Sequence, residues 1–162
     1  MRKFLPWIIV GVVVLFGYFY FKGINNTAVT LDQDVKESWG NVQTSYQRRN
    51  DLIGNLVKTV KGAADFEKST LEAVITARSK ATAVTIDPTN ITPEQLAQFN
   101  QAQSGVSSAL SRLLVTVEQY PDLKANQNFL KLQDELASTE NQILTARTRF
   151  NEAVKLYNRH VT

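Results

Sequence analysis

The sequence contains no cysteine and only one histidine, His160, close to its end. The absence of cysteine excludes a disulfide framework, a cysteine-ligated zinc site and a lipidated N-terminal cysteine. With a single histidine the chain cannot build a zinc or di-iron site of the Glu-x-x-His type, and it has no histidine pair for acid–base chemistry. We therefore expect no metal, no cofactor and no catalytic residues.

Glycine is also sparse, with 7 residues scattered along the chain. None of them falls in a G-x-x-x-x-G-K loop, the pattern that binds phosphate groups through its backbone. No segment alternates apolar and polar residues with the period of a β-strand. Together these absences predict an all-helical protein that is not an enzyme.

The excess of positive charge is small and local. The chain has 18 Lys and Arg against 15 Asp and Glu, a formal charge of +3. Arg2, Lys3 and Lys22 account for the whole excess, and all three flank one hydrophobic segment. The remainder is neutral, whereas nucleic-acid binding requires a clustered basic face. Nucleic acid is therefore not expected as a partner.

That hydrophobic segment runs from Phe4 to Phe21 and comprises 18 residues without a charge. As a helix it would span roughly 27 Å, close to the hydrocarbon thickness of a bilayer. Aromatic residues lie near both of its ends, which is typical of membrane interfaces. A cleaved signal peptide and a buried core helix are the alternatives, but no small-residue cleavage site follows the apolar run. We predict a transmembrane anchor at 4–21 that lies in the lipid bilayer, preceded by a short tail at 1–3.

The charges around this segment predict its orientation. Arg2 and Lys3 precede it, and only Lys22 follows closely. Because basic residues favour the cytoplasmic side, we expect a cytoplasmic N-terminus and an exported domain. The expected location is the cell (inner) membrane, with a single pass.

The rest of the chain reads as helices with a seven-residue apolar repeat. After a juxtamembrane linker at 22–28, the repeats predict helices at about 29–61, 65–82, 92–119 and 122–159. Asp87 to Asn90 have turn chemistry, and Thr92 to Gln95 have the sequence of a capping box with Pro93 at the first helical position. Regular repeats and short connections predict an antiparallel, up-and-down bundle at 29–162.

Gly62 decides between two arrangements of this bundle. If the first helix ends there, the domain is a four-helix bundle with a short second helix. If the helix continues, the domain is a three-helix stalk roughly 80 Å long. Glycine is common at helix ends and costs about 1 kcal/mol in a helix interior, which favours the four-helix arrangement.

Arg49 is the one charged residue in the apolar seam of the first long helix. A buried charge requires a partner, and Glu140 on the last helix is our candidate, since a four-helix bundle places both at the same end. The structural interpretation is a pair that fixes helix register; the functional one is a buried ligand or switch site. Gln103 and Thr139, which lie in other seams, are likewise expected to set register.

Three motifs in order resemble the LemA family. They are QRRNDLIGNLV at 47–57 with TVKG at 59–62, YPDLKAN at 120–126, and TEN at 139–141 with matching residues up to Asn158. The resemblance covers about 29–161 and implies a bacterial, membrane-anchored helical bundle. It implies no catalytic residue, because the role of the family is not established. Family members often continue through a Phe-Pro-containing tail, so we expect this chain to be a truncated form.

Two hypotheses of function follow. The first is a membrane-anchored, non-catalytic scaffold or adaptor that binds protein partners, as yet unidentified, or further copies of itself. Its candidate interaction surface combines two aromatic residues expected to be exposed with three polar motif residues: Trp39, Tyr46, Arg48, Asp51 and Asn55. The alternative is a sensor or binder of a small molecule or lipid, through a polar layer around Arg49 and Glu140.

Overall fold

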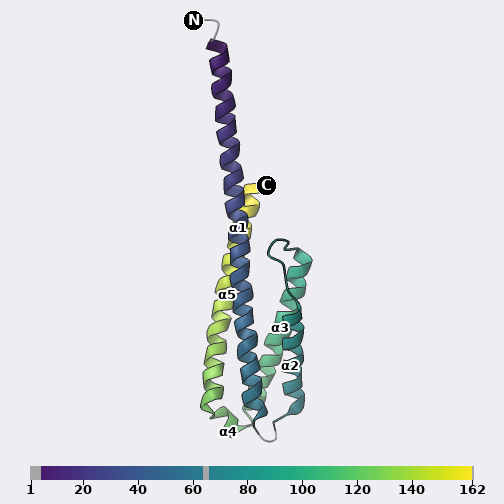
Figure 1. Cartoon of the computed structure of the whole chain (residues 1–162). Coiled ribbons are helices and arrows are strands. Elements are labelled where there is room, and N and C mark those ends of the chain that lie inside the picture. Colours follow the sequence, from purple (N-terminus) through teal and green to yellow (C-terminus); the bar gives the residue numbers. More distant parts are fainter. Residues whose placement is uncertain (1–4, 64–65, 162) are drawn as a thin grey trace.

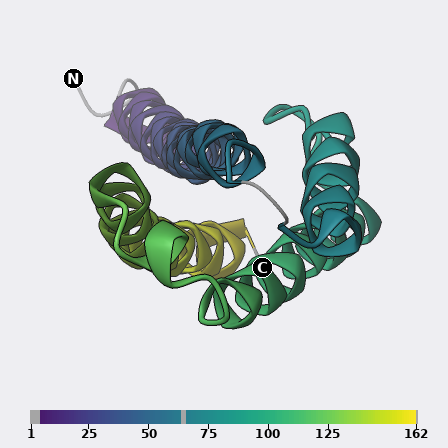
Figure 2. The same cartoon turned by 90° about the horizontal axis from the view of Figure 1, so that it is seen from below.

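The computed structural model describes residues 5–63 and 66–161, and all its regular structure is helical. The helices are α1 (Leu5–Lys61), α2 (Lys68–Ala83), α3 (Pro93–Val117), α4 (Pro121–Lys124) and α5 (Gln127–Val161). The long helices lie side by side in alternating directions, and α4 closes the end of the bundle at which α1 turns into α2 (Figure 1). Seen along its axis, the bundle pairs α1 with α5 and α2 with α3 (Figure 2).

The turn at Gly62 follows the four-helix alternative. Helix α1 ends at Lys61, and the Gly62 backbone N–H still donates to the carbonyls of Lys58 and Thr59, both at 3.3 Å. The chain then reverses into α2, which begins at Lys68. The predicted start of this helix, at residue 65, lies outside the described residues.

Helix α1 differs from the prediction at its other end. We expected a linker at 22–28, but these residues continue the helix without a break, and α1 comprises 57 residues. The segment contains no proline, and its single Gly23 costs only about 1 kcal/mol in a helix. The Thr30 hydroxyl also donates to the Asn26 carbonyl one turn earlier, at 3.0 Å. A polar composition is therefore not enough to end this helix.

Within the part of the chain that was described, no helix has a stretch long and apolar enough to cross a membrane. The predicted anchor at 4–21 falls partly outside that part, since residues 1–4 and the side chains of 5–10 and 21 are not described. The predicted tail at 1–3 lies outside it entirely. The anchor therefore stays a prediction.

The predicted capping box at the start of α3 is present. The Thr92 hydroxyl accepts the backbone N–H of Gln95 at 3.2 Å, and the Gln95 side chain accepts the Thr92 backbone N–H at 3.0 Å. Pro93 occupies the first turn, where its missing N–H is not needed.

The last helix does not run unbroken from Asp122, as we expected. The short helix α4 ends at Lys124, and α5 begins at Gln127. Asn126 causes the break, because its Oδ1 accepts the backbone N–H groups of Asn128 at 2.9 Å and Phe129 at 3.2 Å. An asparagine in this role caps a new helix.

The core consists of two apolar clusters, one toward each end of the bundle. The cluster nearer the α1–α2 turn is centred on completely buried aliphatic side chains: Ile53, Leu56, Val60, Val74, Val106 and Leu113. The other is rich in aromatic rings and contains Trp39, Val42, Tyr46, Ile86, Phe99, Ile143, Ala146 and Phe150. A layer of polar residues lies between the two clusters, and this layer is the candidate site.

Candidate functional site

A layer of buried polar residues divides the two apolar clusters. Along α1, Arg49 lies between Tyr46 of one cluster and Leu52 of the other; Gln103 on α3 and Thr139 on α5 hold the same position. These three side chains are at most 4% exposed. The layer therefore belongs to the interior of the bundle and involves three helices.

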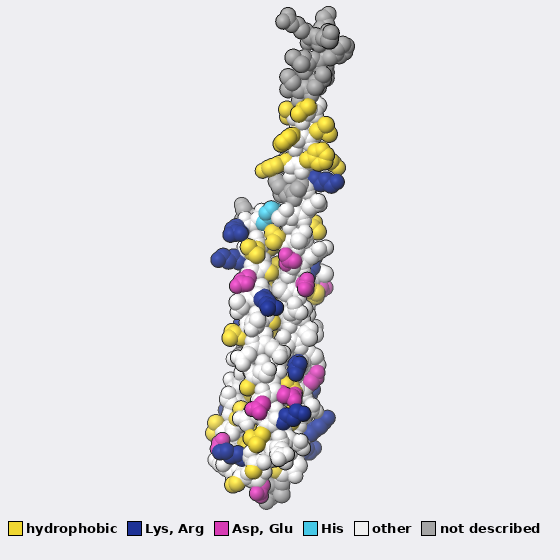
Figure 3. All heavy atoms as spheres, turned by 90° about the vertical axis from the view of Figure 1, so that its left-hand side faces the viewer, with side chains coloured by type: hydrophobic (Ala, Val, Ile, Leu, Met, Phe, Trp, Pro, Cys, Tyr) yellow, Lys and Arg dark blue, Asp and Glu magenta, His cyan; other side chains and the backbone are white. Residues whose placement is uncertain are grey.

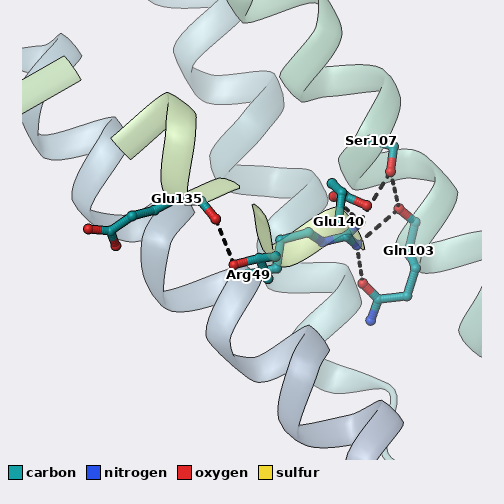
Figure 4. Close-up of polar contacts among 6 residues, drawn as sticks. Arg49, Gln103, Ser107, Glu135 and Glu140 are labelled. Atoms are coloured by element: carbon teal, nitrogen blue, oxygen red, sulfur yellow. Dashed lines mark hydrogen bonds and ion pairs between the residues drawn. The ribbon is translucent and has the colours of Figure 1, made fainter. Parts of the chain in front are cut away.

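Arg49 connects the three helices. Its Nη1 donates to Glu140 Oε1 on α5 at 3.0 Å and to the Ser107 hydroxyl on α3 at 3.2 Å. Its Nη2 donates to the side-chain and main-chain oxygens of Gln103, also on α3. Figure 4 shows Gln103, Ser107 and Glu140 converging on the Arg49 guanidinium. The expected partners Arg49 and Glu140 are thus brought together.

The two charges of this pair lie in different environments. The Arg49 side chain is 2% exposed, whereas that of Glu140 is 46% exposed. The guanidinium also lies over the Tyr46 ring, 4.9 Å from its centre, and its buried Nε has no hydrogen-bond partner. Because water screens the carboxylate side, the neutral and cation–π contacts carry part of the stabilisation.

Thr139 does not join this network. Its hydroxyl donates to the Glu135 carbonyl one turn earlier in α5, at 2.8 Å. The hydroxyl is thus bonded within its own helix, although the side chain is buried. Of the two further seam residues expected to set register, only Gln103 crosses between helices.

The predicted interaction surface divides into two parts, and its aromatic part is wrong. Trp39 and Tyr46 are 2% and 4% exposed, so they are core residues. The Trp39 ring packs against Phe99 and Phe150, with centroids at 5.3 and 5.1 Å, and Tyr46 packs edge-on against Phe99. Phe99 lies on α3 and Phe150 on α5. Side chains from these two helices therefore bury the aromatic rings of α1, and the sequence of α1 alone does not show this.

The polar part of that surface is exposed and lines one hollow. Arg48, Asp51 and Asn55 lie along the rim of a concavity of about 540 Å³ between α1 and the end of α2. Its floor includes Tyr46 and the buried Asn50, whose Oδ1 has no hydrogen-bond partner. The hollow therefore combines a charged, polar rim with a partly apolar floor.

Sequence reasoning missed Arg78, which fastens α2 to α1. Its Nε donates to the Asn50 backbone carbonyl at 2.7 Å, and its guanidinium lies against Gly54, where an added Cβ would be 3.4 Å from Nη2. A side chain that bonds to backbone leaves no partner to find in the sequence. The one signal was Gly54, a glycine inside a helical repeat, which often marks a close approach.

The described residues hold no group of three or more His, Asp or Glu side chains placed to bind a metal ion. The polar layer contains one buried cation, its carboxylate partner Glu140, the Gln103 amide and the hydroxyls of Ser107 and Thr139. Such groups orient and pair, and none of them is an activated nucleophile or a base paired with an orienting group.

Fold and site together define an antiparallel helical bundle divided by a buried arginine layer. The LemA family model matches residues 38–162, and the chain belongs to the LemA family. It is 29% identical to magnetosome protein MamQ 2 of Paramagnetospirillum magneticum over 154 residues, which cover 85% of this chain and 57% of that relative. It is 26% identical to protein LemA of Metamycoplasma hominis, with 87% and 61% covered. The chain thus spans about three fifths of the length of these relatives.

Proposed function

We propose that this protein is a membrane-anchored, non-catalytic scaffold that binds protein partners, or further copies of itself, through its helical bundle. The observation that carries the proposal is the part of α1 outside the bundle. Its side chains between residues 12 and 20 are exposed and largely apolar, reaching 78% for Phe16. Figure 3 shows these hydrophobic side chains around the helix where it leaves the bundle. Soluble monomers rarely expose so much apolar surface, and a bilayer would cover it.

The unbroken course of α1 supports a positioning role. The same helix contains the apolar segment and half of the α1–α5 pair, so no flexible joint separates them (Figure 1). A bilayer around 4–21 would then hold the bundle upright at a defined height. The names of the relatives reported above describe no reaction, which fits a non-catalytic role.

The hollow between α1 and α2 is our candidate for partner binding. Arg48 and Asp51 offer opposite charges at its rim, and Tyr46 and Leu52 contribute apolar surface to its lining. A photo-crosslinking residue at Asn55, in intact cells, should give a defined crosslinked product. The same residue at Gln101, exposed on α3, is the matched control. Equal or absent crosslinking at both positions would count against the hollow.

Orientation is tested separately. We propose a cytoplasmic N-terminus and an exported bundle in the cell membrane, from the charges that flank 4–21. Thr85 is exposed, and the chain has no cysteine of its own, so Thr85→Cys gives a single site for labelling. Labelling of intact cells by an impermeant maleimide supports the exported bundle. Labelling only after lysis reverses the orientation.

A second candidate is the binding of a small molecule through the polar layer. A hollow of about 310 Å³ between α3 and α5 opens onto this layer and is lined by Ser107, Glu140 and Arg147. A ligand that uses Arg49 raises the melting temperature of the wild type but not of Arg49→Leu. Short dicarboxylates and inorganic phosphate are suitable probes. If Arg49 and Glu140 are only a structural pair, Arg49→Leu changes the melting temperature of the free protein, and the probes raise it in neither protein.

A further inference from the structure

The end of α5 lies beside α1 just beyond the predicted anchor. The Trp39 ring on α1 contacts the Phe150 ring on α5, with centroids 5.1 Å apart. Because the two helices are antiparallel and rise equally per residue, Val161 comes opposite Ala28 and Arg159 opposite Thr30. Figure 1 shows the C-terminal end of α5 against α1 at the top of the bundle.

Because α1 is continuous, the distance of an α5 residue from the predicted anchor follows from the α1 residue opposite it. Ala28 follows Phe21 by seven residues, which places Val161 about 10 Å from the end of the predicted anchor, and Arg159 about 14 Å from it. The headgroup layer of a bilayer is roughly 5–8 Å thick on each side. An extended arginine side chain, whose charged end reaches toward the interface, covers most of the remaining gap.

The chemistry of this end suits anionic headgroups. From residue 141 to residue 161, α5 has four basic residues and a single acidic one, Glu152. Lys155 and Arg159 are one turn apart on its outward, exposed face, and Leu156 beside them is 44% exposed. On α1, Asp32 pairs with Lys36 at 2.5 Å.

Two carboxylates of α1 lie away from this face. Asp34 and Glu37 on α1 line a groove that they share with Arg149, further down α5. Figure 3 shows Lys and Arg side chains next to hydrophobic ones at this end of the bundle. Glu152 lies one turn before Lys155 on the same exposed face and offsets part of its charge, so Arg159, nearer the end of the helix, carries most of the net positive charge.

We propose that this face of α5 binds the headgroups of anionic phospholipids, with Arg159 in contact and Lys155 acting through a longer electrostatic attraction. The proposal rests on the membrane anchor proposed above. Each basic residue near an anionic surface strengthens association about fivefold, and the effect fades beyond a Debye length of about 8 Å at physiological salt. Contact on the α5 side would fix how the bundle is rotated about α1, and thus where the α1–α2 hollow faces.

The test uses the full chain in nanodiscs that carry a fluorescence quencher on their headgroups. Val161→Cys, 50% exposed, carries the fluorophore at the proposed contact, and Leu130→Cys, 44% exposed at the other end of α5, is its control. We expect quenching at position 161 to be at least twofold stronger with phosphatidylglycerol than with phosphatidylcholine, and to fall at 1 M salt. Position 130 should show no difference.

Neutral variants then separate headgroup binding from simple proximity. Lys155→Gln with Arg159→Gln should abolish the phosphatidylglycerol-dependent part of the quenching while leaving the value in phosphatidylcholine unchanged, which shows that α5 has not frayed. If quenching at position 161 does not depend on lipid charge, or if its dependence persists in the double variant, headgroup binding is wrong but the anchor is not contradicted. Protein that fails to float with the lipid overturns the anchor and this proposal together.

Discussion

The Arg49 guanidinium and the Glu140 carboxylate are 3.0 Å apart, although 91 residues separate them in the chain. Arg49 is buried and Glu140 is half-exposed, so the pair reaches from the core of the bundle to its surface. Three helices meet at this arginine, because Gln103 and Ser107 accept its remaining terminal N–H groups. The layer therefore aligns α1, α3 and α5 at one height.

Removal of the carboxylate should destabilise the bundle moderately. Glu140→Ala leaves a buried guanidinium with only neutral acceptors, and we expect a loss of about 1–2 kcal/mol. That is less than the roughly 3–5 kcal/mol of a fully buried pair, because water already screens Glu140. Denaturant unfolding of the full chain in detergent measures the loss. Glu152→Ala, an exposed carboxylate on the same helix, should change the free energy of unfolding by less than about 0.5 kcal/mol; equal effects would argue against the pair.

Replacement of the layer by apolar side chains should separate stability from register. Arg49→Met with Gln103→Leu joins the two apolar clusters, and we expect a change from neutral to about 4 kcal/mol more stable. Register should suffer, because nothing polar then aligns the seams. Spin labels at Ser45 on α1 and Gln142 on α5, which line one groove, report this alignment. A broadened distance distribution supports the register role, and a distribution as narrow as that of the wild type contradicts it.

Much of this fold is local chemistry and was therefore predictable from the sequence. The capping box at Thr92 uses residues within one turn, and the corner at Gly62 falls where a glycine interrupts the apolar repeat. The height of Arg49 follows from helix length alone, which is why Glu140 could be chosen as its partner.

Other features depend on contacts that the sequence does not show. The burial of Trp39 depends on Phe99 and Phe150, which lie on other helices. The Arg78 contact is to a backbone carbonyl, which every residue carries. The break at Asn126 follows from the orientation of its side chain, which turns back to cap α5. The sequence does not show this orientation.

The capping box should carry measurable stability. Thr92→Ala removes the hydroxyl that accepts the Gln95 N–H, and we expect a loss of about 1 kcal/mol. Thr92→Ser keeps the acceptor and should lose only a few tenths of that. Thr76→Ala, exposed on α2, is the control and should be close to neutral. Thermal unfolding of the full chain compares the three. A loss at Thr92 no larger than at Thr76 would show that the cap adds nothing.

The contact between Arg78 and α1 predicts opposite effects of two substitutions. Arg78→Ala removes a charge-assisted hydrogen bond to the Asn50 carbonyl and should destabilise the protein by about 1–2 kcal/mol. Gly54→Ala should be neutral or stabilising by up to about 1 kcal/mol, because alanine favours the helix and its Cβ meets Arg78 at an ordinary 3.4 Å. Gly54→Leu has no such space and should lose stability as Arg78→Ala does. If Leu is tolerated as well as Ala, the guanidinium does not lie against this glycine.

Asp87 predicts a pH-dependent turn between α2 and α3. Hydrogen bonds from the Thr89 hydroxyl at 2.6 Å and the Thr89 backbone N–H at 2.8 Å hold the pKa of the Asp87 carboxyl below its ordinary value, and Lys36 adds a weaker attraction. A carboxyl whose pKa is lower in the folded state stabilises that state above its unfolded pKa of about 3.9. This contribution disappears as the pH falls through the folded pKa. Thr89→Val removes the stronger hydrogen bond and should raise the pKa of Asp87 toward the unfolded value, as measured by carboxyl-carbon NMR titration of the full chain. Thr85→Val, in the same connection, should leave the Asp87 pKa unchanged; an unchanged value in Thr89→Val instead would assign the shift to the Thr89 backbone N–H and Lys36 rather than to the hydroxyl.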